Sequence, residues 1–271
     1  MDHLITPDNL KSIMERAIIY DCRYRLTDPD WGHSKYSDGH IPGAFFFDLN
    51  RDMASDVKEH GGRHPLPDID IFVQKLESTG LKDDTMVICY DDNLSGAARM
   101  WFLLKYIGHD NCYILDGGID AWLSAGGKIE KTQRNRNLKG EITPRIRNDL
   151  VADHRFIWIN RDDIELIDAR ENYRYRGESE PIDRIAGRIP GSINIPYLEL
   201  IDGSKFKDEA QLRNYFKPIE KRPVMYCGSG VTSCINFFIM DSLGMSPMLY
   251  VGSYSDWISF RENPIEKDVG R

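Results

Sequence analysis

The chain has 271 residues, a formal net charge of −8 and 41% hydrophobic residues, so it is long enough for two ordinary domains with apolar cores. The acidic balance argues against a nucleic-acid or membrane-surface partner. No apolar run approaches the length of a membrane span, and no secretory signal is visible at the N-terminus. The five cysteines are scattered, odd in number and without a CxxC pair. They indicate neither a disulfide framework nor a metal site, and they favour a reducing, cytoplasmic location.

Short apolar runs alternate with amphipathic stretches along the first half of the chain. They predict strands near 18–21, 44–47, 86–90 and 113–115, and helices near 68–79, 95–107 and 118–125. This order is typical of an α/β domain in which a mainly parallel sheet is flanked by helices. In such domains, ligands bind at the carboxyl ends of the strands.

The second half repeats motifs of the first. Residues 18–23 resemble 165–170, and the turn at 39–44 resembles that at 187–192. The strand before Asp91 corresponds to the strand before Cys227. We therefore expect two tandem domains, residues 1–138 and 139–271, with the polar and basic stretch 131–149 as the linker.

One loop of the second half has the chemistry of a reactive thiol. Residues 224–234 read Val-Met-Tyr-Cys-Gly-Ser-Gly-Val-Thr-Ser-Cys, which predicts a strand, a short loop that begins at Cys227, and a helix. Inward-facing backbone N–H groups and the helix dipole both favour thiolate over thiol. The alternative for a lone cysteine is a buried core position. The Gly-x-Gly loop and its polar neighbours favour catalysis.

With these motifs, the whole chain resembles the tandem-domain rhodanese-like sulfurtransferases. Its first half is similar to their catalytically inactive domain, and its second half to their catalytic domain. The matching motifs are 39–44, 62–67, 98–101 and 115–118 in the first half, and 167–170, 174–178, 180–183 and 227–232 in the second. The Cys-Gly-Ser-Gly-Val-Thr loop is the form associated with 3-mercaptopyruvate sulfurtransferases. Thiosulfate enzymes tend to have a basic Cys-Arg-Lys-Gly loop.

The resemblance implies a sulfurtransferase that needs no cofactor or metal. Sulfur from 3-mercaptopyruvate would be held as a persulfide on Cys227 and passed to cyanide or to a thiol, such as thioredoxin or a low-molecular-weight thiol. The backbone amides of the loop would stabilise the negative sulfur. These amides belong to Gly228, Ser229, Gly230, Val231 and Thr232.

Two residues are candidates for proton transfer. Ser229 could protonate the departing enolate, or it could only hydrogen-bond the loop. His40 matches a histidine that the family places in a charge relay. The alternative is that the Gly-His-Ile-Pro-Gly run around it is a structural turn.

Arginines are candidates for binding the carboxylate of the donor. Arg174 aligns with a family arginine that binds this group. A second family arginine falls where this chain has Asp183, so the neighbouring Arg184 could substitute for it. Arg188 could add positive potential, or it could pair with surface acids.

Other functions stay open. A thiosulfate:cyanide sulfurtransferase is the nearest alternative. A cysteine phosphatase or arsenate reductase would need arginine at position 233, where this chain has Ser233. A non-catalytic sulfur carrier or binding module is a further class, against which the presence of Cys227 argues. Cys234 is more typical of a core position than of a redox partner.

Overall fold

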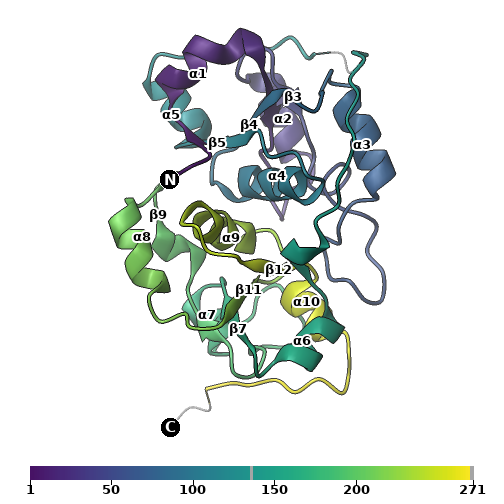
Figure 1. Ribbon diagram of the computed structural model, residues 1–271, viewed down its shortest axis with the longest axis vertical. Coiled ribbons are helices and arrows are strands. Elements are labelled where there is room, and N and C mark those ends of the chain that lie inside the picture. The colour runs from purple at the N-terminus through teal and green to yellow at the C-terminus, as the bar shows by residue number, and fades with distance from the viewer. Residues whose placement is uncertain (135–136, 269–271) are drawn as a thin grey trace. The chain divides into compact units, whose positions relative to one another are not determined.

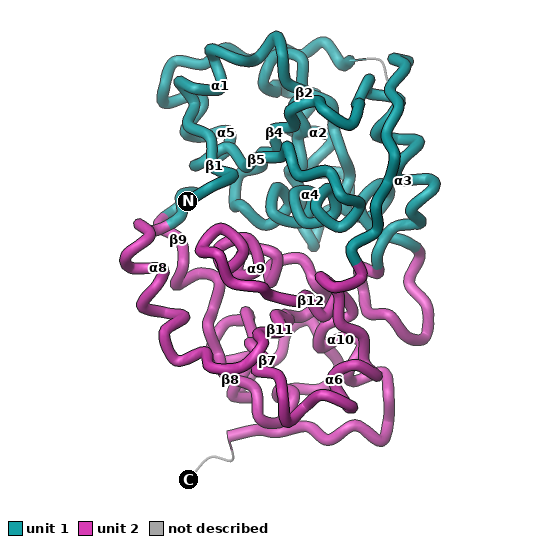
Figure 2. The backbone as a smooth tube through the Cα atoms, viewed as in Figure 1, with its two compact units in different colours: residues 1–55, 66–147, 203–206 teal, residues 56–65, 148–202, 207–271 magenta. Residues whose placement is uncertain are grey.

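The computed structural model describes residues 1–134 and 137–268, and its elements follow one another in an alternating β/α order (Figure 1). The chain forms two compact units (Figure 2). Unit 1 contains residues 1–55, 66–147 and 203–206, and unit 2 contains residues 56–65, 148–202 and the chain from 207 onward. Residues 135 and 136 of the expected linker lie outside the described residues.

Unit 1 is built on a five-stranded sheet in which all paired strands are parallel, in the order β1-β5-β4-β2-β3. Its strands are β1 (Leu4–Ile5), β2 (Ala17–Asp21), β3 (Phe45–Phe46), β4 (Met86–Tyr90) and β5 (Cys112–Leu115), with β10 (Lys205–Phe206) also assigned to this unit. Its helices are α1 (Pro7–Ile13), η1 (Met14–Arg16), α2 (Trp31–Asp38), α3 (Ile69–Glu77), α4 (Ser95–Tyr106) and α5 (Gly118–Ser124).

Unit 2 repeats this plan with the parallel order β6-β12-β11-β7-β8. Its strands are β6 (Val151–Ala152), β7 (Ile164–Asp168), β8 (Ile193–Asn194), β9 (Ile201–Asp202), β11 (Arg222–Tyr226) and β12 (Met248–Tyr250). Its helices are η2 (Asn148–Leu150), α6 (His154–Asn160), α7 (Asn172–Tyr175), η3 (Tyr197–Leu200), α8 (Glu209–Phe216), α9 (Ser233–Ser242) and α10 (Ser253–Trp257). The expected α/β class with parallel sheets is confirmed.

The strands and helices predicted for the first half correspond to β2, β3, β4, β5, α3, α4 and α5. Helix α2 was not predicted, because Trp31–Asp38 has mostly polar residues and buries only Gly32 and Tyr36. Short segments with so weak an apolar pattern give little signal of a helix.

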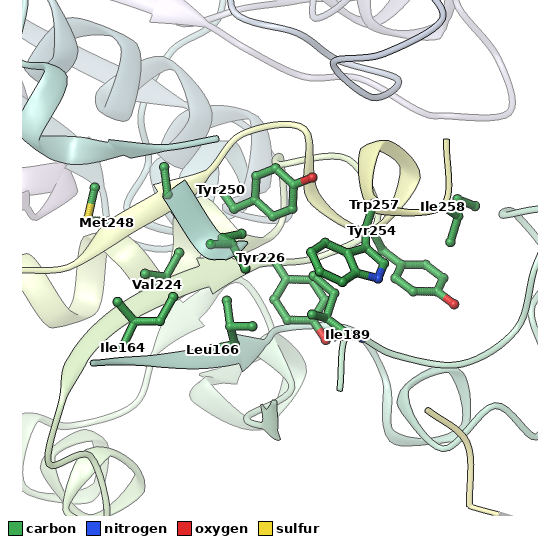
Figure 3. Close-up of a cluster of buried hydrophobic side chains, with 12 residues drawn as sticks. Ile164, Leu166, Ile189, Val224, Tyr226, Met248, Tyr250, Tyr254, Trp257 and Ile258 are labelled. Carbon is green, nitrogen blue, oxygen red and sulfur yellow. Dashed lines mark hydrogen bonds between the residues drawn. The ribbon is translucent and has the colours of Figure 1, made fainter. Parts of the chain in front are cut away.

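The apolar core of unit 2 lies against β7, β11 and β12, and Figure 3 shows its side chains converging from these strands and from α10. Val224 and Tyr226 on β11 are fully buried. The Tyr226 hydroxyl accepts a hydrogen bond from the backbone N–H of Ile189 and lies 2.8 Å from the Ser192 hydroxyl. This packing fixes the end of β11, from which the next residue, Cys227, projects.

The Asp-x-Arg motifs of the two halves have the same structural role. Arg170 is paired with Asp168, at 2.6 Å, and donates to the carbonyl of Gly187 at 2.7 Å. In unit 1, Arg23 is paired with Asp21 and donates to the carbonyl of Gly39 at 2.9 Å. Each arginine thus links the end of a strand to the Gly-x-Ile-Pro-Gly turn of its own unit.

The boundary between the two units falls between residues 147 and 148, later in the sequence than the expected boundary between residues 138 and 139. Residues 138–147 hydrogen-bond to unit 1, as Gly140 N–H does to the Glu77 carbonyl and Arg147 N–H to the Tyr106 carbonyl. Residues 56–65, from the first half of the sequence, belong to unit 2. Neither assignment has a local signal in the sequence, because both depend on contacts with distant residues.

Candidate active site

Cys227 follows directly after β11, and α9 begins six residues later at Ser233, as the strand-loop-helix pattern predicts. The residue is 2% exposed. Its sulfur accepts hydrogen bonds from the backbone N–H of Gly230, at 3.2 Å, and from the hydroxyl of Ser233, at 3.3 Å. Burial alone would raise the pKa of the Cys227 thiol, but hydrogen bonds from Ser233, Thr232 and the loop amides outweigh it and lower the pKa. The site therefore favours the thiolate, which is the nucleophilic form.

Gly230 has the backbone angle and the close approach that only glycine tolerates. Its φ is +75°, and a Cβ at this position would lie 2.1 Å from the carbonyl oxygen of Val251. The same residue presents its N–H to the Cys227 sulfur. The glycine is thus needed to bring the loop amide to the thiolate.

Ser229 contacts a histidine from the segment 56–65. His64 Nδ1 lies 2.8 Å from the Ser229 hydroxyl oxygen, and both residues are buried. The segment is held against α10 of the same unit, where Gly61 N–H donates to Asp256 and Arg63 N–H donates to the Ser255 hydroxyl. A hydroxyl paired with an imidazole beside the thiol is an arrangement that can transfer a proton.

Arg63, the residue before His64, reaches the same loop. Its guanidinium is ion-paired with Asp183, the position at which the family resemblance had suggested a missing arginine. A Cβ on Gly228 would lie 2.8 Å from Nη2 of Arg63 and 3.3 Å from Nη2 of Arg174. Two guanidinium groups therefore converge beside the residue that follows the thiol.

Arg174, the expected carboxylate ligand, is 7% exposed and surrounded by acids. It pairs with Glu180 at 2.8 Å and with Asp183 at 3.1 Å, and Glu171 lies 3.6 Å away. The structure thus brings Arg174 to the thiol loop, but with carboxylates of the protein already on it.

The remaining predicted residues are His40 in unit 1 and Arg184 and Arg188 in unit 2. His40 is fully buried in unit 1, stacked on Tyr36 with its Nδ1 2.7 Å from the Tyr36 carbonyl oxygen, and its backbone pairs with that of Glu130. The described contacts of His40 are those of a turn, and the histidine that meets Ser229 is His64. The charge-relay role of His40 stays a prediction.

Arg188 occupies the turn of unit 2 that corresponds to that of His40. Its backbone pairs with that of Glu266, and its guanidinium is ion-paired with Glu266 and with Asp268. Arg184 donates to the carbonyl of Ile258. Neither contact involves the thiol loop, so among the described residues the arginines beside Gly228 are Arg63 and Arg174.

Unit 1 contains a corresponding loop with a carboxylate in place of the thiol. Asp91 follows β4, and its two oxygens accept backbone N–H groups of Leu94 at 2.7 Å and Gly96 at 2.7 Å. Burial, followed by the charge of the neighbouring Asp92, raises the pKa of Asp91 to about 7, although these hydrogen bonds act to lower it. The anion cradle is thus present in both units, and in unit 1 a fixed side chain fills it.

Arg63, His64 and Ser233 were missed as site residues by the sequence analysis. The available signal was the 62–67 motif, which was used only to recognise the family. The stretch between β8 and α8 in the second half has neither arginine nor histidine. An arginine and a histidine between glycines and prolines, with no counterpart in that stretch of the second half, could have indicated a functional insertion.

The described residues contain no helix long and apolar enough to cross a membrane. Within the same residues, no group of three or more histidine, cysteine, aspartate or glutamate side chains is placed to hold a metal ion.

Comparison with known proteins agrees with the repeat. The family described as "Rhodanese-like domain" matches residues 6–125 and 158–260. A Pseudomonas aeruginosa protein named "Probable 3-mercaptopyruvate sulfurtransferase" is 39% identical over 92% of this chain and 91% of its own. A Mycobacterium tuberculosis protein named "Putative thiosulfate sulfurtransferase SseB" is 37% identical over 97% of this chain and 96% of its own. The 3-mercaptopyruvate sulfurtransferase of Leishmania major superposes with a TM-score of 0.87 and 27% identity over 96% of this chain and 75% of its own.

Proposed function

Because the chain belongs to the rhodanese family and is a sulfurtransferase, we propose that its donor is 3-mercaptopyruvate and that Cys227 holds the sulfur as a persulfide. The observation that carries this proposal is the contact set of the Cys227 sulfur: an N–H from Gly230 and a hydroxyl from Ser233. Both donors stabilise a negative sulfur before and after attack.

In the donor half-reaction, the Cys227 thiolate attacks the thiol sulfur of 3-mercaptopyruvate. A sulfur–sulfur bond forms, the carbon–sulfur bond breaks, and its electron pair leaves with pyruvate as the enolate. The enolate takes a proton, which we assign to the Ser229 hydroxyl, whose oxygen lies 2.8 Å from His64 Nδ1. A donor with no carbon leaving group, such as thiosulfate, has no need of this proton.

In the acceptor half-reaction, a thiolate or cyanide attacks the outer sulfur of the persulfide, and Cys227 leaves as the thiolate. We propose a low-molecular-weight thiol or thioredoxin as the acceptor, with no cofactor. The hydrogen bonds to the Cys227 sulfur make it a good leaving group, since they lower its pKa.

Thiosulfate is the second candidate donor, because Arg63 and Arg174 bring positive charge to a loop that has none of its own. The mycobacterial relative has a name that refers to thiosulfate. The two donors are distinguished by kcat/KM with the same acceptor. We expect 3-mercaptopyruvate to be preferred, since the His64–Ser229 pair serves its leaving group alone. A higher kcat/KM for thiosulfate would assign the protein to the second activity.

A further inference from the structure

Helix α10 holds the backbone of the thiol loop through its first residues. The backbone N–H of Tyr254 donates to the Cys227 carbonyl at 2.9 Å. The backbone N–H of Ser255 donates to the Gly228 carbonyl at the same distance. In return, the Ser253 hydroxyl accepts the N–H of Cys227 at 3.1 Å. The start of α10 thus fixes the loop at the reactive cysteine.

The same helix holds the segment 56–65 by hydrogen bonds to the backbone of that segment. The Asp256 carboxylate accepts the N–H of Gly61 at 2.6 Å. The Ser255 hydroxyl accepts the N–H of Arg63 at 3.1 Å. Two consecutive residues of α10 therefore bind the segment directly before the histidine that meets the thiol loop.

The segment approaches the helix so closely that only glycine fits at position 62. Gly62 has a φ of +79°, and a Cβ on it would lie 2.3 Å from the carbonyl oxygen of Gly252. Gly252 directly precedes α10. The segment therefore has little freedom to shift along the helix while these hydrogen bonds are in place.

Asp256 anchors the segment from a buried position. The residue is 5% exposed, and its second carboxylate oxygen accepts the Tyr250 hydroxyl at 2.5 Å. Because Tyr250 is the last residue of β12, the carboxylate also ties the segment to the end of the sheet. The contact between His60 and Ser259 lies on an exposed surface instead, where water can replace either partner.

We propose that Asp256 and Ser255 are positioning residues for the proton transfer to the enolate. They hold the segment 56–65 so that His64 meets the Ser229 hydroxyl. One helix fixes both the loop and the segment, and this shared support sets the 2.8 Å distance between the imidazole Nδ1 and the hydroxyl oxygen. The inference rests on the proposed function, in which this pair protonates the departing enolate.

The test is a double-mutant comparison of persulfide formation from 3-mercaptopyruvate. Asp256→Ala removes the acceptor of the Gly61 N–H, and we expect it to slow this step by roughly 10- to 100-fold, the scale for a misplaced catalytic group. In a His64→Gln background, the same substitution should slow the step by less than about twofold, because no imidazole is left to position. Asp256→Asn, whose amide oxygen can still accept that N–H, should keep most of the wild-type rate. Equal slowing by Asp256→Ala in the two backgrounds would overturn the proposal.

Tyr250→Phe is the matched control, because it removes the other hydrogen bond of Asp256 and leaves the contact with Gly61. We expect it to lower the melting temperature while the rate of persulfide formation stays within about twofold, since the loss of one buried hydrogen bond affects stability and not the position of the segment. Ser259→Ala, on the exposed surface, should leave both unchanged. Slowing by Tyr250→Phe as large as that by Asp256→Ala would overturn the proposal, because a general loss of stability would then explain both.

The NMR resonances of the His64 ring give a readout that needs no sulfur donor. Ser229→Ala shows the shift that follows loss of the hydroxyl partner. Asp256→Ala should move the ring resonances in the same direction, whereas Tyr250→Phe should not, and unchanged resonances in Asp256→Ala would overturn the proposal. If Asp256→Ala does not fold, Ser255→Ala takes its place in each measurement, and the same outcomes decide. If the resonances move as expected but 3-mercaptopyruvate does not load the wild type, the positioning role stands and the donor assignment fails alone.

Discussion

The Nδ1 atom of His64 lies 2.8 Å from the hydroxyl oxygen of Ser229, although the two residues are 165 positions apart in the chain. This contact joins residues 56–65 to the loop that presents the thiol. It gives the serine a proton source that its own loop lacks. Only the donor half-reaction of the proposed mechanism should depend on this contact, because only that half-reaction releases an enolate.

His64→Gln should therefore slow persulfide formation from 3-mercaptopyruvate by about 100-fold, the lower end of general acid–base effects. Transfer of sulfur from enzyme that is already loaded should hardly change. Stopped-flow measurement of each half-reaction checks this. His60→Gln is the matched control, because His60 makes a similar contact, 2.7 Å from the Ser259 hydroxyl, on an exposed surface. Equal slowing of both half-reactions would contradict the proton-transfer role.

Ser233→Ala should raise the pKa of Cys227. The wild-type pKa is lowered by hydrogen bonds that include the Ser233 hydroxyl, and a hydrogen bond to a charged group contributes about 1.5–3 kcal/mol, or about 1–2 pKa units. The inflection in the pH dependence of iodoacetamide alkylation should move to higher pH by this amount. Ser259→Ala, outside the loop, should leave it in place. An inflection that does not move in Ser233→Ala would show that the Ser233 hydroxyl does not lower the pKa of Cys227.

Gly230→Ala should disturb the thiol loop far more than Gly191→Ala. Both glycines have positive φ, +75° and +76°, but a Cβ at 230 would meet the Val251 carbonyl oxygen at 2.1 Å, whereas one at 191 would have no atom within 4 Å. The control should cost about 1–2 kcal/mol from the backbone angle alone. Gly230→Ala should cost more and also slow alkylation of Cys227. Similar unfolding free energies for the two variants, measured in urea, would show that the close approach to the Val251 carbonyl oxygen adds no cost in stability.

Asp91→Cys, made in the Cys227→Ser background, should not form a persulfide. Burial and Asp92 raise the pKa of the carboxylate now at this position, and both would oppose a thiolate there. Arg25, the nearby cation, is paired with Asp92 at 2.5 Å. Mass spectrometry after incubation with 3-mercaptopyruvate checks this. A sulfur adduct on residue 91 would refute the explanation of why unit 1 lacks a second thiol site.

The sequence was sufficient for the parts of the site that are local. The strand β11, the glycine loop and the helix α9 follow from apolar periodicity and glycine placement within about twenty residues, and the repeat located the same loop at Asp91. His64 and Arg63 could not be placed in this way. Their segment has no periodicity, and it is tied to unit 2 by distant contacts such as Gly61 N–H to Asp256, at 2.6 Å. Arg174 lies near the loop in the structure, but its ion pairs with Glu180 and Asp183 depend on how those residues fold back onto it.

The most direct test of the central claim is the rate at which Cys227 gains one sulfur atom from 3-mercaptopyruvate and from thiosulfate at equal concentration, followed by mass spectrometry of the intact protein and of its peptides. The account predicts that the adduct maps to the peptide containing Cys227 and forms faster with 3-mercaptopyruvate. It should be absent in Cys227→Ser but present in Cys234→Ser, because the wild-type Cys234 thiol donates a hydrogen bond to the Gly230 carbonyl. An adduct on another cysteine, or faster loading by thiosulfate, would contradict it.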